Sequence, residues 1–121
     1  MNYSSIVIDH FEQPRNVISD CQPTALSGRA GSQASGMLVE FCLEHENGLI
    51  AHASFRAWGC PHTIAVASWL TEELPGKAIK SVRSLDLDAI AGKLDLPAEK
   101  WGCILMAEDA LRAATRDLAD D

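Results

Sequence analysis

The chain of 121 residues has few basic side chains, few cysteines and no long apolar run. Lysine and arginine number 10 against 17 aspartates and glutamates, which gives a formal net charge of −7. The basic residues are also scattered, whereas binding to nucleic acid needs a basic patch. No apolar run approaches the length of a membrane span. We therefore expect neither nucleic acid nor a membrane as a partner.

The first residues lack the basic start of a signal peptide, so we expect a cytoplasmic location. The four cysteines are 21, 18 and 43 residues apart, which matches neither a zinc ribbon nor a CxxC redox motif. A cytoplasmic chain of this length has a core of its own, so disulfides are the less favoured interpretation. Cys21, in a predicted loop, is expected to be a free thiol. The length indicates a single domain over residues 1–121.

Apolar spacing and chain breakers predict the order helix, strands, helices. The predicted elements are a helix over 5–12, a weak strand within 24–36 that leads into a loop, a hairpin with strands over 37–45 and 49–57, and helices over 62–74, 87–94 and 104–118. This order indicates an α+β domain, in which helices pack against one face of a small antiparallel three-stranded sheet.

The hairpin has a register that its apolar faces support. A three-residue turn at 46–48 pairs Phe41 with Ala53, so that the apolar faces of the two strands coincide. The same register places Cys42 opposite His52 on the polar face. Two such side chains could bind a metal, but exposed strand residues are the favoured interpretation.

Two similar tripeptides, Trp58-Gly59-Cys60 and Trp101-Gly102-Cys103, each deliver a cysteine to the start of a predicted helix. Unpaired N–H groups and the positive end of the helix dipole favour the thiolate there. Thiolates bind metals and attack sulfur, so the two tripeptides indicate sulfur or metal chemistry. Two thiols are too few to complete a tetrahedral site. No carboxylate has a spacing suited to a catalytic base, so we do not expect an enzyme.

At these residues the chain resembles the NifU N-terminal/IscU-type iron–sulfur cluster scaffolds. The likeness runs from about residue 2 to residue 119. The matching segments are Ile8-Asp9-His10-Phe11-Glu12-Gln13-Pro14-Arg15-Asn16, Trp58-Gly59-Cys60 with Ile64-Ala65, Gly76-Lys77, and Cys103-Ile104-Leu105-Met106-Ala107-Glu108-Asp109-Ala110 after Leu96-Pro97.

The resemblance implies a site that has lost part of its ligand set. Scaffolds of this family hold a [2Fe–2S] cluster, or zinc, with three cysteines plus an aspartate or a histidine. The first cysteine and the aspartate correspond here to Ser35 and Met37, and the histidine corresponds to Gly102. The other two cysteines match Cys60 and Cys103.

The resemblance also suggests roles for the residues that remain. It implies that Cys103 accepts persulfide sulfur and that Cys60 is a metal ligand; two inert structural thiols are the alternative. His62, two residues after Cys60, could replace a lost ligand, although a capping or solvent-facing histidine is the commoner case. Ser35 could ligate iron as an alkoxide, but its hydroxyl resists deprotonation near pH 7.

The sequence therefore predicts an iron–sulfur assembly scaffold that binds iron or a [2Fe–2S] cluster through Cys60 and Cys103. A cysteine desulfurase is the partner that the resemblance implies, and a homodimer would bring four thiolates to one cluster. Residues 96–100 differ from the family's chaperone-binding segment, so that partner is not expected. A zinc-bound or metal-free sulfur acceptor and a non-catalytic adaptor that binds a desulfurase are the alternatives.

Overall fold

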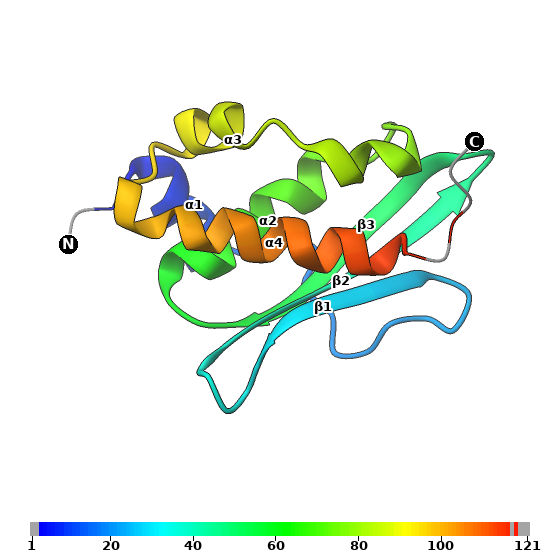
Figure 1. Ribbon diagram of the computed structural model, residues 1–121. Coiled ribbons are helices and arrows are strands. Elements are labelled where there is room, and N and C mark those ends of the chain that lie inside the picture. The colour runs from blue at the N-terminus through cyan, green and yellow to red at the C-terminus, as the bar shows by residue number, and fades with distance from the viewer. Residues whose placement is uncertain (1–2, 117, 119–121) are drawn as a thin grey trace.

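The computed structural model describes residues 3–116 and 118. Its elements in chain order are α1 (Ser5–Glu12), β1 (Leu26–Ser32), β2 (Met37–Glu46), β3 (Leu49–Trp58), α2 (Pro61–Glu73), η1 (Ile79–Ser84), α3 (Leu87–Leu94), η2 (Ala98–Lys100) and α4 (Trp101–Ala114). The strands form one antiparallel sheet in the order β1-β2-β3. Helix α4 packs on β1 and β2 and helix α2 packs on β3, which confirms the predicted α+β architecture (Figure 1).

The helices lie close to their predicted positions, with one exception. Ser4 caps α1 by accepting the N–H of Val7, and Asp86 caps α3 in the same way. Helix α4 was predicted over 104–118 but runs from Trp101 to Ala114. The 3-10 turn η2 leads directly into it, which explains the earlier start. At the other end, the Arg83 guanidinium donates to the Thr115 carbonyl, and position 117 of the predicted helix lies outside the described residues.

The hairpin has a different register from the predicted one. Phe41 lies opposite Phe55, so the predicted pairing with Ala53 is wrong by two residues. The turn has two residues, Asn47 and Gly48, both with positive φ, as the favoured Asn-Gly hairpin turn requires. The shorter turn accounts for one residue of the shift, and an irregularity in the pairing between Glu44 and His45 accounts for the other. A shift of two leaves every side chain on the same face, so apolar alternation could not tell the two registers apart.

The corrected register also separates Cys42 from His52. Cys42 lies opposite Ser54, and His52 lies opposite Glu44. Cys42 instead forms a disulfide with Cys21, with the two Cα atoms 5.7 Å apart. The prediction that Cys21 is a free thiol is therefore wrong, because the segment that carries it returns over the sheet to Cys42.

The segment between α1 and β1 is held against β3 by backbone hydrogen bonds. The N–H of Ile18 donates to the Phe55 carbonyl at 2.9 Å, and the N–H of Phe55 donates to the Asn16 carbonyl at 3.0 Å. These bonds form an isolated parallel bridge at the edge of the sheet. The segment thus places its next residues, including Cys21, on the face of the sheet opposite α4.

The core lies between the sheet and helices α2 and α4. Its largest fully buried side chains include Phe41, Phe55, Leu43, Leu70, Ile104 and Leu111. Gly28 of β1 allows α4 to approach the strand at backbone distance, at Ala110 to Ala114. None of the helices in residues 3–116 combines the length and the hydropathy that crossing a membrane requires.

His10, buried between α1 and α2, makes the stability of the fold depend on pH. Its Nδ1 lies 2.8 Å from Ser68 Oγ, which already accepts the N–H of Arg15. The Ser68 hydroxyl can donate its proton to Nδ1, an arrangement that suits neutral imidazole. Burial, and then the positive charge of Arg15, lower the pKa of His10 below its ordinary 6.5, although Glu72 acts in the opposite direction.

We expect the free energy of unfolding to fall as the pH drops below 6.5, the ordinary pKa of His10. The folded-state pKa is the lower one, so the unfolded chain binds the proton first, and the stability present above pH 6.5 is lost on acidification. Urea unfolding over a pH series measures this. His10→Gln should reduce the slope, because it removes the buried imidazole. Equal slopes for His10→Gln and the parent chain would contradict the assignment.

Candidate functional site

Cys60 and Cys103 meet at the hydroxyl of Thr63. Cys60 is the N-cap of α2 and is followed by Pro61 at the first helical position. Cys103 lies in the first turn of α4. Thr63 Oγ1 is 3.5 Å from the Cys60 sulfur and 3.5 Å from the Cys103 sulfur. Two helix starts, remote in the chain, therefore bring both free thiols to one buried oxygen.

The thiol of Cys60 is activated by its neighbours. It is half-buried, and burial by itself would raise its pKa. Hydrogen bonds from the Thr63 side chain and backbone and from the His62 backbone outweigh that effect, and Lys100 adds a positive charge, so that the pKa lies below its ordinary value. The ammonium nitrogen of Lys100 is 3.9 Å from the Cys60 sulfur.

Cys103 has the opposite character. It is buried, with 4% of its surface exposed. Burial, and next the charge of the neighbouring Cys60, raise the pKa of Cys103, although the Thr63 hydrogen bond acts against this. The pair therefore consists of a half-buried thiol whose pKa is lowered and a buried thiol whose pKa is raised.

The position before Cys60 requires a glycine. Its φ of +147° lies in the region that side chains disfavour, and a Cβ there would come within 2.9 Å of Thr63 Oγ1. Gly102 does not play the same role, since no atom of the described residues lies within 4 Å of a Cβ built on it. The two tripeptides thus look alike, but the structure requires the glycine only in the first one.

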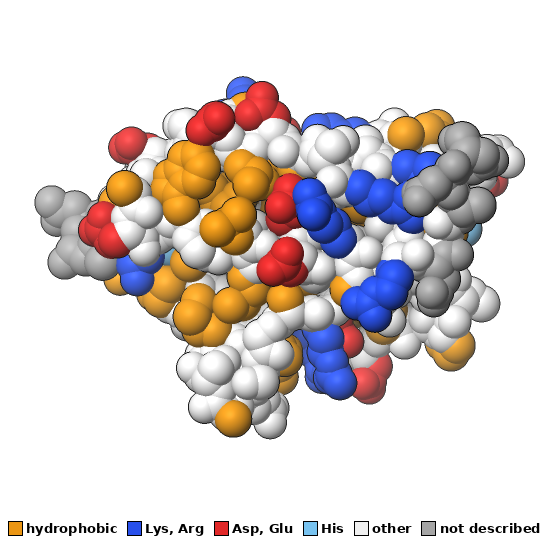
Figure 2. Space-filling view, viewed as in Figure 1, with side chains coloured by type: hydrophobic (Ala, Val, Ile, Leu, Met, Phe, Trp, Pro, Cys, Tyr) orange, Lys and Arg blue, Asp and Glu red, His pale blue; other side chains and the backbone are white. Residues whose placement is uncertain are grey.

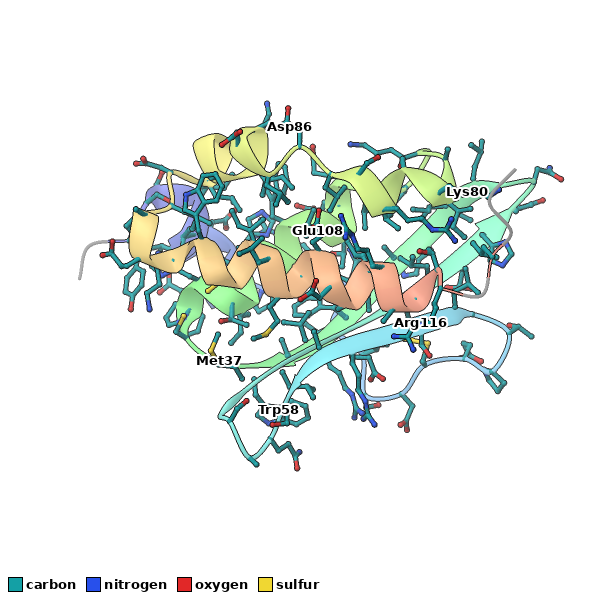
Figure 3. All side chains as sticks on the ribbon, viewed as in Figure 1. Met37, Trp58, Lys80, Asp86, Glu108 and Arg116 are labelled. Carbon is teal, nitrogen blue, oxygen red and sulfur yellow. A yellow bond between two sulfur atoms is a disulfide. The ribbon has the colours of Figure 1, made fainter. Side chains whose placement is uncertain are left out.

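The two thiols line a cleft of about 570 Å³. Its other lining residues are Gly36, Met37, Trp58, Gly59, Glu99, Lys100, Gly102 and Met106. Met37 and Trp58 lie on the sheet side of the N-terminal half of α4 (Figure 3). Hydrophobic side chains gather over this half of the helix, whereas basic ones gather over its C-terminal half (Figure 2). The rim includes Trp58, which is 42% exposed.

His62 is buried in the first turn of α2, two residues after Cys60. Its ring is buried against that of Tyr3, with the centroids 4.9 Å apart, and within the described part of the chain neither ring nitrogen has a hydrogen-bond partner. Burial, and next the charge of Lys100, lower its pKa. Among residues 3–116 and 118, no three His, Cys, Asp or Glu side chains gather as a group able to hold a metal. His62 as a ligand therefore stays a prediction.

Ser35 lies in the exposed turn between β1 and β2. Its hydroxyl lies 2.8 Å from the Ser32 carbonyl and 3.1 Å from that of Met37, so it serves the local turn. Its neighbours Gly36 and Met37 line the cleft, but Ser35 is not among the lining residues. The role of Ser35 as an iron ligand also remains a prediction.

The comparison with known proteins decides the family. The model of the NifU-like N terminal domain matches residues 2–120. The chain belongs to this family. Iron sulfur cluster assembly protein 1 of Trachipleistophora hominis is 42% identical over 118 residues, which cover 96% of this chain and 86% of that one. The scaffold protein IscU of Escherichia coli K12 is 38% identical over 120 residues, covering 97% and 94%.

Solved structures show the same fold at low identity. A putative SUF-system scaffold from Fervidobacterium islandicum AW-1 superposes with a TM-score of 0.69 at 17% identity, covering 93% of this chain and 96% of that one. A NifU-like N-terminal protein from Brucella abortus gives a TM-score of 0.58 at 15% identity, covering 94% and 77%. At this identity the likeness supports the fold alone.

Two residues of this NifU-like site, Thr63 and Lys100, were not predicted from the sequence. Thr63 follows Cys60 by three residues, so one helical turn returns its side chain to the sulfur. Lys100 ends the 3-10 turn η2 just before α4, and only the docking of α4 beside α2 brings it to Cys60. The three-residue spacing between Cys60 and Thr63 could have identified Thr63 as part of the site. The 40 residues between Cys60 and Lys100 give no such signal.

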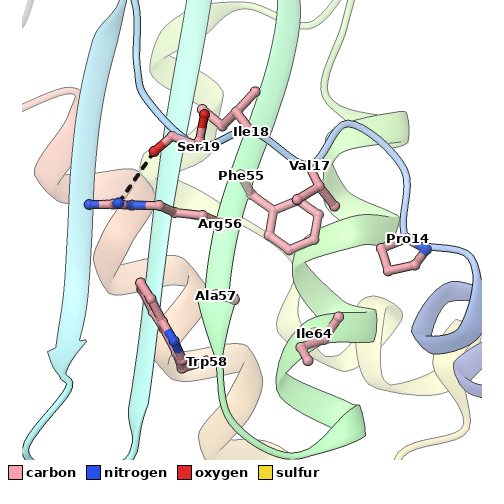
Figure 4. A pocket seen from close by; sticks show the side chains of 9 residues that line it. All are labelled: Pro14, Val17, Ile18, Ser19, Phe55, Arg56, Ala57, Trp58 and Ile64. Atoms are coloured by element: carbon pink, nitrogen blue, oxygen red, sulfur yellow. Dashed lines mark hydrogen bonds between the residues drawn. The ribbon is translucent and has the colours of Figure 1, made fainter.

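A second cleft of about 410 Å³ also has Trp58 in its lining (Figure 4). It is lined mainly by apolar side chains of β3 and of the segment before β1, such as Val17 and Phe55. Arg56 donates to the Ser19 carbonyl at 3.3 Å across it. No cysteine lines this cleft, so the thiol chemistry belongs to the first one.

Proposed function

We propose that this protein is a scaffold for iron–sulfur cluster assembly, built as a single domain over residues 1–121. One observation carries the proposal: two free thiols share the Thr63 hydroxyl at a cleft, in a chain about 38% identical to IscU scaffolds over nearly its whole length. Like the relatives that are named scaffolds, it would hold cargo rather than catalyse turnover. The cargo is iron, or a [2Fe–2S] cluster.

The donor set fits half of such a cluster. A [2Fe–2S] centre is usually bound by four thiolates, and this cleft supplies two. A second copy of the chain would supply the other two, and the exposed apolar surface around Trp58 and Leu105 suits contact with another protein. We therefore infer a homodimer around the cargo. Zinc, the alternative metal, would meet the same two thiols, and no observation favours it.

The sulfur would come from a cysteine desulfurase, the partner class that the resemblance implies. We place the protein in the cytoplasm, where the Cys21–Cys42 disulfide would exchange with the reducing thiol pool. The segment at 96–100 differs from the family's chaperone-binding sequence, so chaperone dependence is not proposed.

Anaerobic reconstitution with ferrous iron, cysteine and a cysteine desulfurase tests the proposal. We expect the visible absorption of a [2Fe–2S] centre, with one cluster for each pair of chains and a dimer on size exclusion. Cys60→Ser and Cys103→Ser should each abolish the absorption, because each removes half of the donors that a chain contributes.

The matched control is the double variant Cys21→Ser/Cys42→Ser, which removes the two cysteines outside the cleft. Its absorption should equal that of the parent chain. Normal assembly in both Cys60→Ser and Cys103→Ser would overturn the site, and a colourless parent chain would overturn the scaffold function.

A further inference from the structure

The two thiols of the cleft differ in a way that cluster binding does not require. Cys60 lines the cleft at the surface, with the Lys100 ammonium 3.9 Å from its sulfur. Cys103 also lines the cleft, but it is only 4% exposed, and its sulfur lies 3.5 Å from the Thr63 hydroxyl oxygen. Two equivalent metal ligands would need no such inequality. A half-buried thiol beside an ammonium group, with a buried partner thiol next to it, is the arrangement of a dithiol that exchanges sulfur.

We propose that Cys60 takes up sulfane sulfur and that Cys103 then releases it as sulfide, leaving a Cys60–Cys103 disulfide. This inference rests on the proposed function, since the sulfur enters the same cleft. It reverses the order that the family resemblance implies, in which Cys103 is the acceptor. The reason is access: a persulfide from outside meets the Cys60 sulfur first.

The first step is transfer of the outer sulfur of a donor persulfide. The Cys60 thiolate attacks that sulfur, the donor's S–S bond breaks, and the donor leaves as a thiolate. A new S–S bond forms on Cys60, which becomes a persulfide. Lys100 faces the negative charge of this group. No electrons are gained or lost overall in this step, because sulfane sulfur only changes its carrier.

The second step is internal. The Cys103 sulfur attacks the inner sulfur of the Cys60 persulfide, the bond to the outer sulfur breaks, and that sulfur leaves with the electron pair. The proton of Cys103 passes to the leaving atom, which departs as HS⁻. Sulfane sulfur is reduced by two electrons, and the two thiols are oxidised to a disulfide, so atoms, charge and electrons balance without another reductant.

The position of Thr63 supports this second step. Its Oγ1 lies 3.5 Å from each sulfur, so the two sulfurs cannot be further apart than twice that distance. The hydroxyl can accept the Cys103 proton and donate its own toward Cys60, where the sulfide leaves. Thr63 is buried, so water does not compete for that proton. Thr63 is thus a positioning residue for the release step.

The test uses the full chain in the Cys21→Ser/Cys42→Ser background, reduced, free of iron and with a chelator present. Glutathione persulfide is added in an amount equal to the protein. We expect sulfide in an amount equal to the protein and, by peptide mass spectrometry, a disulfide between Cys60 and Cys103.

The single variants should stop the reaction at different points. Cys103→Ser should trap the persulfide on Cys60 and release almost no sulfide. Cys60→Ser should fail to load sulfur at the parent rate. Cys103→Ala replaces Cys103→Ser if a buried serine prevents folding. Sulfide release from either Cys103 variant at the parent rate, or a stable persulfide on Cys103 in the parent chain, would overturn the proposal.

Thr63→Val separates positioning from folding. It should load persulfide on Cys60 but slow sulfide release about tenfold, the effect of losing one hydrogen bond to a charged group. Thr63→Ser should restore the rate. Unchanged release in Thr63→Val would overturn the role of Thr63.

Failure of this inference and failure of the scaffold function are distinguishable. Cluster assembly from ferrous iron and inorganic sulfide, with a dithiol reductant, needs no sulfur release from persulfide. A chain that assembles the cluster in this way but releases no sulfide from glutathione persulfide keeps the scaffold function and loses the inference. A chain that releases sulfide but assembles no cluster would keep the inference and lose the scaffold function.

Discussion

Gly28→Ala is expected to lower the free energy of unfolding by about 3 kcal/mol, the upper part of the range for overpacking. A Cβ at this position would collide with the backbone of α4, at the Ala114 nitrogen and the Ala110 carbonyl oxygen, and would lie 2.7 Å from the Ala113 carbonyl carbon. These atoms belong to a helix and cannot rotate away as a side chain would. Relief would require α4 to move off β1.

Urea unfolding of the full chain measures this effect, and Gly92→Ala is the matched control. Gly92 lies inside α3, and among residues 3–116 and 118 no atom comes within 4 Å of a Cβ built on it. Alanine there should stabilise the chain by up to about 1 kcal/mol, because glycine is a poor helix former. A Gly28→Ala variant as stable as the parent would show that α4 does not approach β1 as described.

Reduction of the Cys21–Cys42 disulfide is expected to destabilise the fold by about 3 kcal/mol. The bond joins residues 21 apart in the chain, with a Cα separation of 5.7 Å that suits a disulfide. It restricts the unfolded chain, and this restriction is lost on reduction. For a domain of this size the midpoint of thermal unfolding should fall by roughly 10 °C.

Thermal unfolding with and without a phosphine reductant provides the measurement. The double variant Cys21→Ser/Cys42→Ser should unfold near the temperature of the reduced parent chain and should not respond to the reductant. Equal midpoints for the oxidised and reduced parent chain would contradict the prediction.

Local signals in the sequence were sufficient for the elements and for the fold class. Helical spacing, strand alternation and chain breakers all act within a few residues, so a single sequence contains them. The hairpin register failed because a shift of two residues preserves the apolar face. The start of α4 failed because nothing in the sequence separates a 3-10 turn from the helix that it joins.

The site was only partly accessible from the sequence. The pairing of Cys60 with Cys103 followed from the family resemblance and from two similar tripeptides, and the structure brings both sulfurs to Thr63. Their inequality depends on how α2 and α4 dock, which no local pattern reveals. The Cys21–Cys42 bond depends on the return of an irregular segment over the sheet, which is equally invisible to spacing rules.

The position of the two thiols on different helices has a thermodynamic consequence. Cys60 begins α2 and Cys103 lies in the first turn of α4, so the donor pair exists only while those helices are docked. Cargo that binds both sulfurs therefore adds its binding free energy to the docked state, about 2.7 kcal/mol at a concentration a hundredfold above Kd. By the same linkage, a recipient protein that separates the two helices lowers the affinity for the cargo. Release of the cargo would then accompany the undocking of α2 from α4.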